Sequence, residues 1–161
     1  MNLDKVFEIQ KKLDAKFAEN IDPNESNLQT KKIIALIVEI SEFANEVQEF
    51  KYWKMNKNID KAKVLEEYAD GIHFLSSLSI GFGLCGEEFN PKVVANTFSK
   101  QLAVVFEKAG QLFSSDSKAL LKEVFELYLG LAKILDINEE VIIESFFRKN
   151  EINFQRIKNN Y

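Results

Sequence analysis

The segment 33–54 begins as a core helix and then becomes acidic without losing its helical period. "IIALIV" (33–38) is purely apolar, and four glutamates follow within the next eleven residues. Each residue of a helix advances about 100°, so these glutamates fall within an arc of roughly 80° beside the apolar face. The pattern predicts a helix that is buried on several sides and still carries a carboxylate stripe, formed by Glu39, Glu42, Glu46 and Glu49.

The rest of the chain has the same helical character. It has 161 residues with only six Gly and two Pro, so helix formers dominate. Apolar residues recur at helical spacing, and we expect an all-α helical bundle of about six helices without strands. No repeat or linker divides the sequence, which predicts a single domain over residues 1–161. The expected helices span 3–18, 27–51, 60–81, 91–113, 117–136 and 138–158.

Composition and charge exclude several classes of partner. The net charge of −4 disfavours duplex nucleic acid. Cys85 is the only cysteine, so no intrachain disulfide is possible, and we expect a cytoplasmic protein. The opening residues, "MNLDKVFEIQKK", carry charges throughout, so we expect no signal peptide. No apolar run approaches the roughly 20 residues that span a bilayer, so we expect no membrane partner.

A second acidic pair lies in "VLEEYADGIHFLSSL" (64–78). Glu67 and Asp70 are three residues apart and share a helical face with apolar neighbours. Two helices joined by a short loop tend to pack antiparallel, which would bring Glu39 and Glu42 to this pair. Carboxylate oxygens select hard cations such as Mg²⁺ or Mn²⁺, and Mg²⁺ commonly shares its ligand shell with substrate phosphates. The sequence therefore predicts a metal platform for a phosphorylated substrate; a solvated acidic face is the alternative.

Other site chemistries have little support. A di-iron carboxylate bundle takes two Glu-x-x-His motifs, but His73 is the only histidine, and zinc sites fail for the same reason. Cys85 shows no sign of activation as a nucleophile. "GFGLCG" (81–86) follows a helix and not a strand, so it is no nucleotide-binding glycine loop. We interpret His73 as a hydrogen-bonded helix residue at the edge of the site and not as a ligand.

The order Glu-x-x-Glu, 24 residues, Glu-x-x-Asp resembles the all-α nucleoside triphosphate pyrophosphatase superfamily, which includes MazG-like enzymes. Four further stretches are similar to its dimeric dUTPase branch. They are "IQKKLD" (9–14), "FKYWK" (50–54), "EEYADGIHFLSSL" (66–78) and "RKNEINFQRIKN" (148–159). The resemblance covers most of the chain, and the motifs come in the family's order.

This resemblance implies a homodimer that hydrolyses dUTP, and also dUDP, to dUMP. It implies Mg²⁺, or Mn²⁺, held by Glu39, Glu42, Glu67 and Asp70. A water would attack a phosphorus in line, with Glu42 as the catalytic carboxylate that orients or deprotonates it. Glu46 continues the stripe and is expected to assist as a further catalytic residue or ligand, whereas Glu49 is expected to be solvated.

The resemblance also implies contacts to the nucleotide. The C-terminal segment is basic, and Lys149, Asn153 and Arg156 share a helical face. A basic end that complements the helix dipole is the alternative, and Ile157 departs from the family's Arg-Gln pattern. The expected phosphate and sugar contacts are Lys54, Arg148, Lys149, Asn150, Asn153 and Arg156. The expected base contacts are Gln10, whose amide can donate and accept, and the rings of Trp53 and Phe74, although Phe74 could equally be a core residue.

Two other functions stay open at this point. One is a pyrophosphatase of the same superfamily that acts on dCTP or a modified nucleotide. The other is a non-catalytic helical interaction module, which would bind its partner whether or not the four carboxylates were intact.

Overall fold

The structure is a computed structural model that describes residues 1–86 and 88–159. The described residues form six α-helices and one short 3₁₀ helix, with no strand. The expected all-α bundle of about six helices is therefore confirmed. The helices are α1 (Asp4–Ala18), α2 (Leu28–Val47), α3 (Lys61–Gly81), α4 (Phe98–Gln111), η1 (Leu112–Ser114), α5 (Lys118–Ile134) and α6 (Glu139–Lys158).

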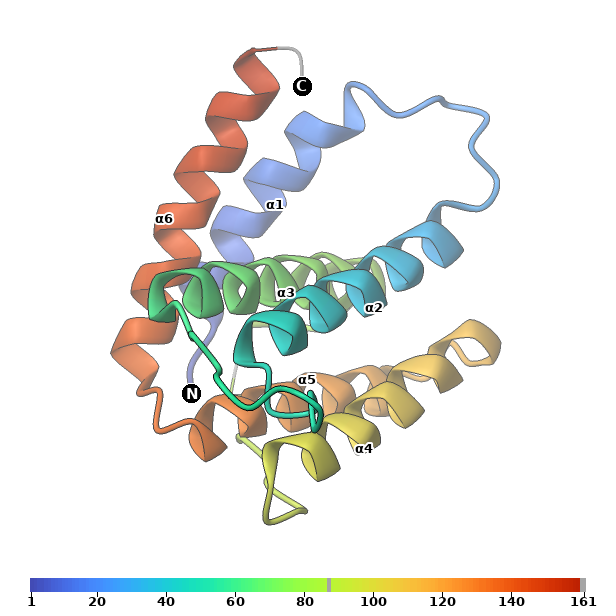
Figure 1. Cartoon of the computed structure of the whole chain (residues 1–161). Coiled ribbons are helices and arrows are strands. Elements are labelled where there is room, and N and C mark those ends of the chain that lie inside the picture. Colours follow the sequence, from blue (N-terminus) through green and yellow to red (C-terminus); the bar gives the residue numbers. More distant parts are fainter. Residues whose placement is uncertain (87, 160–161) are drawn as a thin grey trace.

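Helix α3 is the centre of the bundle and contacts α1, α2, α5 and α6. In Figure 1, α2 and α3 run side by side, α1 and α6 cross them steeply on one side, and α4 and α5 form a layer below. Helix α3 can be surrounded in this way because most of its faces carry apolar or small residues. Its three serines are also buried. This central position places any side chain on the α2–α3 seam close to α1 and α6 as well.

A cluster of aromatic rings ties the layers together. The rings of Tyr68 and Tyr128 stack with centroids 4.8 Å apart, and Phe43 packs edge-on against both. The Tyr128 hydroxyl donates to the Tyr68 carbonyl at 3.0 Å, so its polar atom is satisfied inside the core. A Cβ at Gly71 would lie 2.2 Å from the same hydroxyl oxygen. Only glycine therefore lets α3 approach α5 this closely, one residue after Asp70.

Side-chain caps set where several helices begin. Asp60 accepts from the backbone N–H groups of Ala62 and Lys63, and Ser117 and Asn138 cap α5 and α6 in the same manner. These starts agree with the predicted ranges to within one residue.

The fourth helix begins at Phe98 and not at 91, so the predicted start was wrong. Thr97 caps the helix through the N–H of Lys100. The residues before it are held outside the helix, because Gln101 Nε2 donates to the Lys92 carbonyl and Gln101 Oε1 accepts from Val94 N–H.

The second helix ends at Val47 and not at 51, which is a second correction. Gln48 adopts the left-handed conformation at φ 61°. Its side chain then secures the following loop: Nε2 donates to the Asn58 carbonyl, and Oε1 accepts from Lys54 Nζ at 2.6 Å. Among the described residues, no helix combines the length and hydrophobicity that crossing a bilayer requires.

Candidate active site

Three acidic side chains meet on the seam between α2 and α3. Glu39 comes from α2, and Glu67 and Asp70 come from successive turns of α3. Each offers one carboxylate oxygen, and these oxygens all lie within 4.8 Å of one another. All three side chains are half-buried. The structure thus brings together three of the four residues predicted as metal ligands.

The cluster is electrostatically unfavourable without a cation. Burial raises the pKa of Glu39 to about 7, and the negative charges of Asp70, Glu42 and Glu67 add to the effect. Burial and the neighbouring charge of Asp70 also raise the pKa of Glu67. Converging carboxylates that lose solvent resist ionisation unless a positive charge is nearby, so the geometry favours binding of a cation.

The structure supplies one such charge in Lys149. Its Nζ lies 2.6 Å from Asp70 Oδ2 and 2.8 Å from Glu66 Oε1, and only 6% of the side chain is exposed. Burial alone would lower the pKa of Lys149, but its hydrogen bonds to Asp70 and Glu66 outweigh this and raise it. The hydrogen bond from Lys149 lowers the pKa of Glu66. For Asp70, burial outweighs the hydrogen bond from Lys149, and the pKa stays raised. Lys149 is thus paired with the acidic cluster.

Glu66 is a site residue that the sequence reasoning missed. It directly precedes Glu67, so it points away from the face defined by the Glu-x-x-Asp spacing. Its only sequence signal is the double glutamate in "LEEYAD" (65–70). Its partner Lys149 is 83 residues away, so the pairing depends on how α6 packs against α3.

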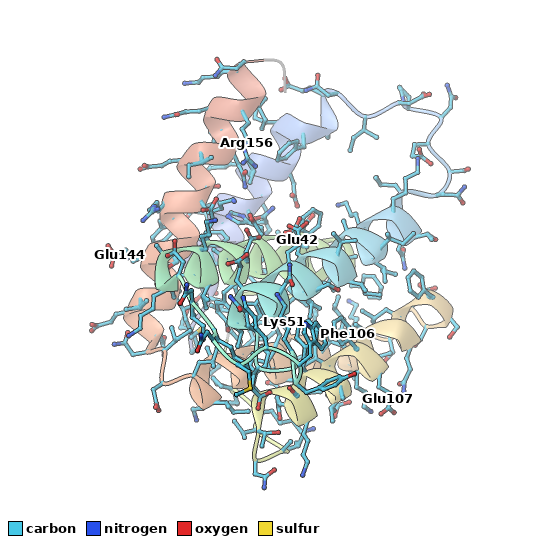
Figure 2. The ribbon with its side chains drawn as sticks, viewed as in Figure 1. Glu42, Lys51, Phe106, Glu107, Glu144 and Arg156 are labelled. Atoms are coloured by element: carbon cyan, nitrogen blue, oxygen red, sulfur yellow. The ribbon has the colours of Figure 1, made fainter. Side chains whose placement is uncertain are left out.

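The other glutamates of the α2 stripe have different surroundings. Glu42 is exposed and close enough to raise the pKa values of Glu39 and Glu67. Figure 2 shows Glu42 on the α2–α3 pair, whereas Glu144 lies on the outer side of α6. Glu46 is half-buried one turn further along. Glu49 is exposed as expected, but it also accepts from Ser99 N–H at 2.6 Å and so caps α4.

A cavity of about 670 Å³ opens beside the acidic cluster, between α1, α2 and α3. It begins one helical turn away on both helices of the seam: Ala35 precedes Glu39 by four residues, and Phe74 follows Asp70 by four. Its wall is mainly apolar, with a few polar groups, which is typical of a small-molecule site. The lining includes Gln10, Asp14, Phe17, Lys32, His73 and Phe74.

Two of the three predicted base contacts line this cavity, and the third does not. Gln10 and Phe74 are in the wall. Trp53 is 63% exposed in the loop after α2, where its ring packs edge-on against Phe50 and Tyr52. Lys54 belongs to the same loop and donates to Gln48. The structure therefore places Trp53 and Lys54 at the end of α2, outside the cavity.

The predicted contacts on α6 are spread along the helix. Lys149 and Asn150 are buried, and the Oδ1 of Asn150 has no hydrogen-bond partner among the described residues. Asn153 is half-buried, and Arg148 and Arg156 are exposed. The positive charges of both arginines reach Glu66, and that of Arg156 also reaches Asp70. This side of α6 therefore adds positive potential near the cluster.

Comparison with protein families decides between the open alternatives. A family model described as dUTPase matches residues 2–161. The chain belongs to the dUTPase family. It is accordingly a dUTP diphosphatase, a nucleoside triphosphate pyrophosphohydrolase. A search of curated proteins found no match.

The dUTPase family generally uses a divalent metal, and the residues present fit one. The donors in the cluster are carboxylate oxygens, which are the ligands that Mg²⁺ and Mn²⁺ prefer. Their mutual repulsion, seen in the raised pKa of Glu39, is relieved by a cation. Of the three carboxylates in the cluster, Asp70 forms an ion pair with Lys149 through Oδ2. The other two, Glu39 and Glu67, form no ion pair with a described residue.

Proposed function

We propose that this dUTPase hydrolyses dUTP, and also dUDP, to dUMP with Mg²⁺ held by Glu39, Glu42, Glu67 and Asp70. One observation carries the proposal: the carboxylate cluster and the apolar cavity are adjacent, separated by one turn on both α2 and α3. A nucleotide matches this arrangement, because it has a charged phosphate end for the metal cluster and a flat base for the apolar cavity. Mn²⁺ would serve in place of Mg²⁺, because the oxygen donors suit both ions.

When bound, Mg²⁺ supplies charge neutralisation for the phosphate oxygens and Lewis acidity for hydrolysis. The chain's own residues would position the reactants. Glu42 is exposed beside the cluster, which suits a carboxylate that orients and deprotonates the attacking water. Glu46, half-buried on the same stripe, would support it.

The positive side of α6 would receive the phosphates and sugar. Arg148 and Arg156 already act electrostatically on the acidic cluster. Lys149 would exchange part of its pairing with Asp70 for a phosphate oxygen once a metal neutralises the carboxylates. Asn150 and Asn153 would donate or accept at the sugar, and the unpartnered Oδ1 of Asn150 supports this role. Trp53 and Lys54 would reach the nucleotide only by movement of their loop.

We further propose that the enzyme is a cytoplasmic homodimer of single-domain chains. An apolar surface supports the dimer: Ile34 and Val38 on α2 and Phe113 on η1 are each about half exposed. A groove of about 360 Å³ between α2 and α4 includes Phe50 and Phe106, and its lining begins at Ser41, three residues after Val38 on α2. Contiguous exposed apolar surface commonly marks an interface. The single cysteine, Cys85, suits a reducing compartment.

The test is phosphate and pyrophosphate release from dUTP, dUDP, dTTP, dCTP and UTP, with Mg²⁺ and then with EDTA. Turnover that needs Mg²⁺ and is confined to dUTP and dUDP is expected. Glu42→Gln should lower kcat on the order of 10²- to 10⁴-fold without unfolding the chain, whereas Glu107→Gln, an exposed change on α4, should not. Comparable turnover of dCTP, or activity that survives EDTA, would contradict the proposal.

A further inference from the structure

Three polar side chains form a chain of hydrogen bonds at one end of the cavity. Gln10 on α1 is 3% exposed, and its Nε2 donates to Asp14 Oδ1 at 2.8 Å. Its Oε1 lies 2.8 Å from Nδ1 of His73, which is 4% exposed on α3. All three residues line the cavity. This arrangement is absent from the sequence pattern, because Gln10 and His73 are 63 residues apart.

The chemistry of the three groups fixes the direction of each hydrogen bond. An ionised carboxylate can only accept, so the Gln10 amide must turn its nitrogen to Asp14. Its oxygen then faces His73, and because that oxygen can only accept, His73 Nδ1 must carry the hydrogen. Burial lowers the pKa of His73 to about 3, which keeps the ring neutral. The network therefore selects one amide orientation and one histidine tautomer, with Nε2 bare.

The fixed amide has one hydrogen left for the cavity. Its Oε1 is engaged by His73, and one of its two N–H groups is engaged by Asp14. The remaining group is the second N–H, which is a donor. A glutamine that was free to turn could exchange the positions of its donor and its acceptor. This one keeps its free N–H at one fixed position and its Oε1, which retains a second lone pair, on the side of His73.

We propose that Asp14 and His73 are positioning residues that hold the Gln10 amide with its N–H toward the cavity, and that this orientation selects pyrimidines with a carbonyl at C4. The inference rests on the proposed function and assigns the source of its base selectivity. Uracil presents a C4 oxygen, which accepts. Cytosine presents an amino group there, so two donors would face each other and leave buried polar groups unpaired.

The packing around His73 supports a role in orientation. Its ring stacks on Phe146 with centroids 4.2 Å apart, so it cannot turn away from Gln10 easily. Its Nε2 makes no hydrogen bond among the described residues. The Phe146 backbone acts on the ring as a hydrogen-bond acceptor and raises the pKa of His73, but burial outweighs this effect.

A pair of matched variants tests this through the ratio of kcat/KM for dUTP to that for dCTP. His73→Phe keeps a ring against Phe146 but removes the donor to Gln10, and the ratio should fall on the order of 100-fold. His73→Asn places an amide N–H near the position of Nδ1, and most of the ratio should return. Asp14→Asn, which can donate as well as accept, should lower the ratio on the order of tenfold. A ratio that is the same in wild type, His73→Phe and Asp14→Asn would overturn the inference.

The tautomer provides a readout that is independent of activity. His73 is the only histidine, so the imidazole signals in long-range ¹H–¹⁵N NMR spectra can be assigned to it without making further variants. At pH 7 we expect hydrogen on Nδ1 and a bare Nε2; the opposite tautomer would overturn the inference. Failure of the proposed function can be distinguished from failure of this inference, because the wild-type protein would then show no Mg²⁺-dependent turnover of dUTP. In that event, equal binding of dUMP and dCMP would overturn the inference, and tighter binding of dUMP that His73→Phe abolishes would support it.

Discussion

Lys149 Nζ lies 2.6 Å from Asp70 Oδ2, so a buried ammonium occupies the edge of the carboxylate cluster. The same ammonium contacts Glu66 at 2.8 Å, and α6 is thereby tied to α3 at the site itself. One side chain consequently contributes both to the packing of α6 on α3 and to the charge balance of the site.

Lys149→Met should destabilise the metal-free protein by about 3 kcal/mol, because it leaves Glu66 and Asp70 without their cation. Added Mg²⁺ should recover part of this loss by replacing the missing charge. Urea unfolding with EDTA and with Mg²⁺ measures both effects. Lys12→Met is the control, since it breaks the exposed pair with Glu8 and should cost less than about 1 kcal/mol. Equal losses in the two variants would show that Lys149 does not neutralise the cluster.

Glu39→Gln should change how stability depends on pH. The pKa of Glu39 is about 7 in the folded protein, against 4.5 for an ordinary glutamate, so between these values the folded state holds more protons and its stability falls as pH rises. His73 acts in the opposite direction between about 3 and 6.5, because its pKa is lowered. Comparing wild type with Glu39→Gln cancels the contribution of His73.

In EDTA, the two proteins should be similarly stable near pH 4.5, and Glu39→Gln should become the more stable one by pH 8. The measurement is the midpoint of urea unfolding at each pH. A stability difference that stays constant across this pH range would contradict the raised pKa of Glu39.

Gly71→Ala should destabilise the fold by about 1–3 kcal/mol, because its Cβ would lie 2.2 Å from the Tyr128 hydroxyl oxygen. The displaced backbone next to Asp70 should also weaken Mg²⁺ binding, which isothermal calorimetry measures. Gly110→Ala has open space around its Cβ and should be neutral or stabilising. A Gly71→Ala protein as stable as Gly110→Ala would show that α3 and α5 do not pack this closely.

Val38→Asp should separate the proposed dimer, because it places a charge in the exposed apolar surface of α2. An increase of tenfold or more in the dimer dissociation constant is expected, corresponding to about 1.4 kcal/mol. Sedimentation velocity measures it, with Val93→Asp, an exposed change in the segment before α4, as the control. If Val93→Asp, and not Val38→Asp, produced monomers, the interface would lie elsewhere.

The helices and the acidic residues were predictable because they depend on local periodicity. Helical spacing placed Glu39 on one segment and Glu67 and Asp70 on the next, and antiparallel packing joined them. The early end of α2 was not predictable, because Gln48 is not a residue that typically adopts positive φ, and its stabilising contact with Asn58 lies ten residues ahead. The partnership of Glu66 with Lys149 and that of Gln10 with His73 arise only from tertiary packing. The sequence pattern does not indicate which turn of α6 or α1 faces α3.

The most direct test of the proposed site is a crystal structure with Mn²⁺ and α,β-imido-dUTP, which hydrolyses slowly. Anomalous scattering identifies the metal without ambiguity. We predict Mn²⁺ bound to carboxylate oxygens of Glu39, Glu42, Glu67 and Asp70, with the uracil in the cavity lined by Gln10 and Phe74. Metal bound away from this cluster, or a base lying outside the cavity, would contradict the proposed site.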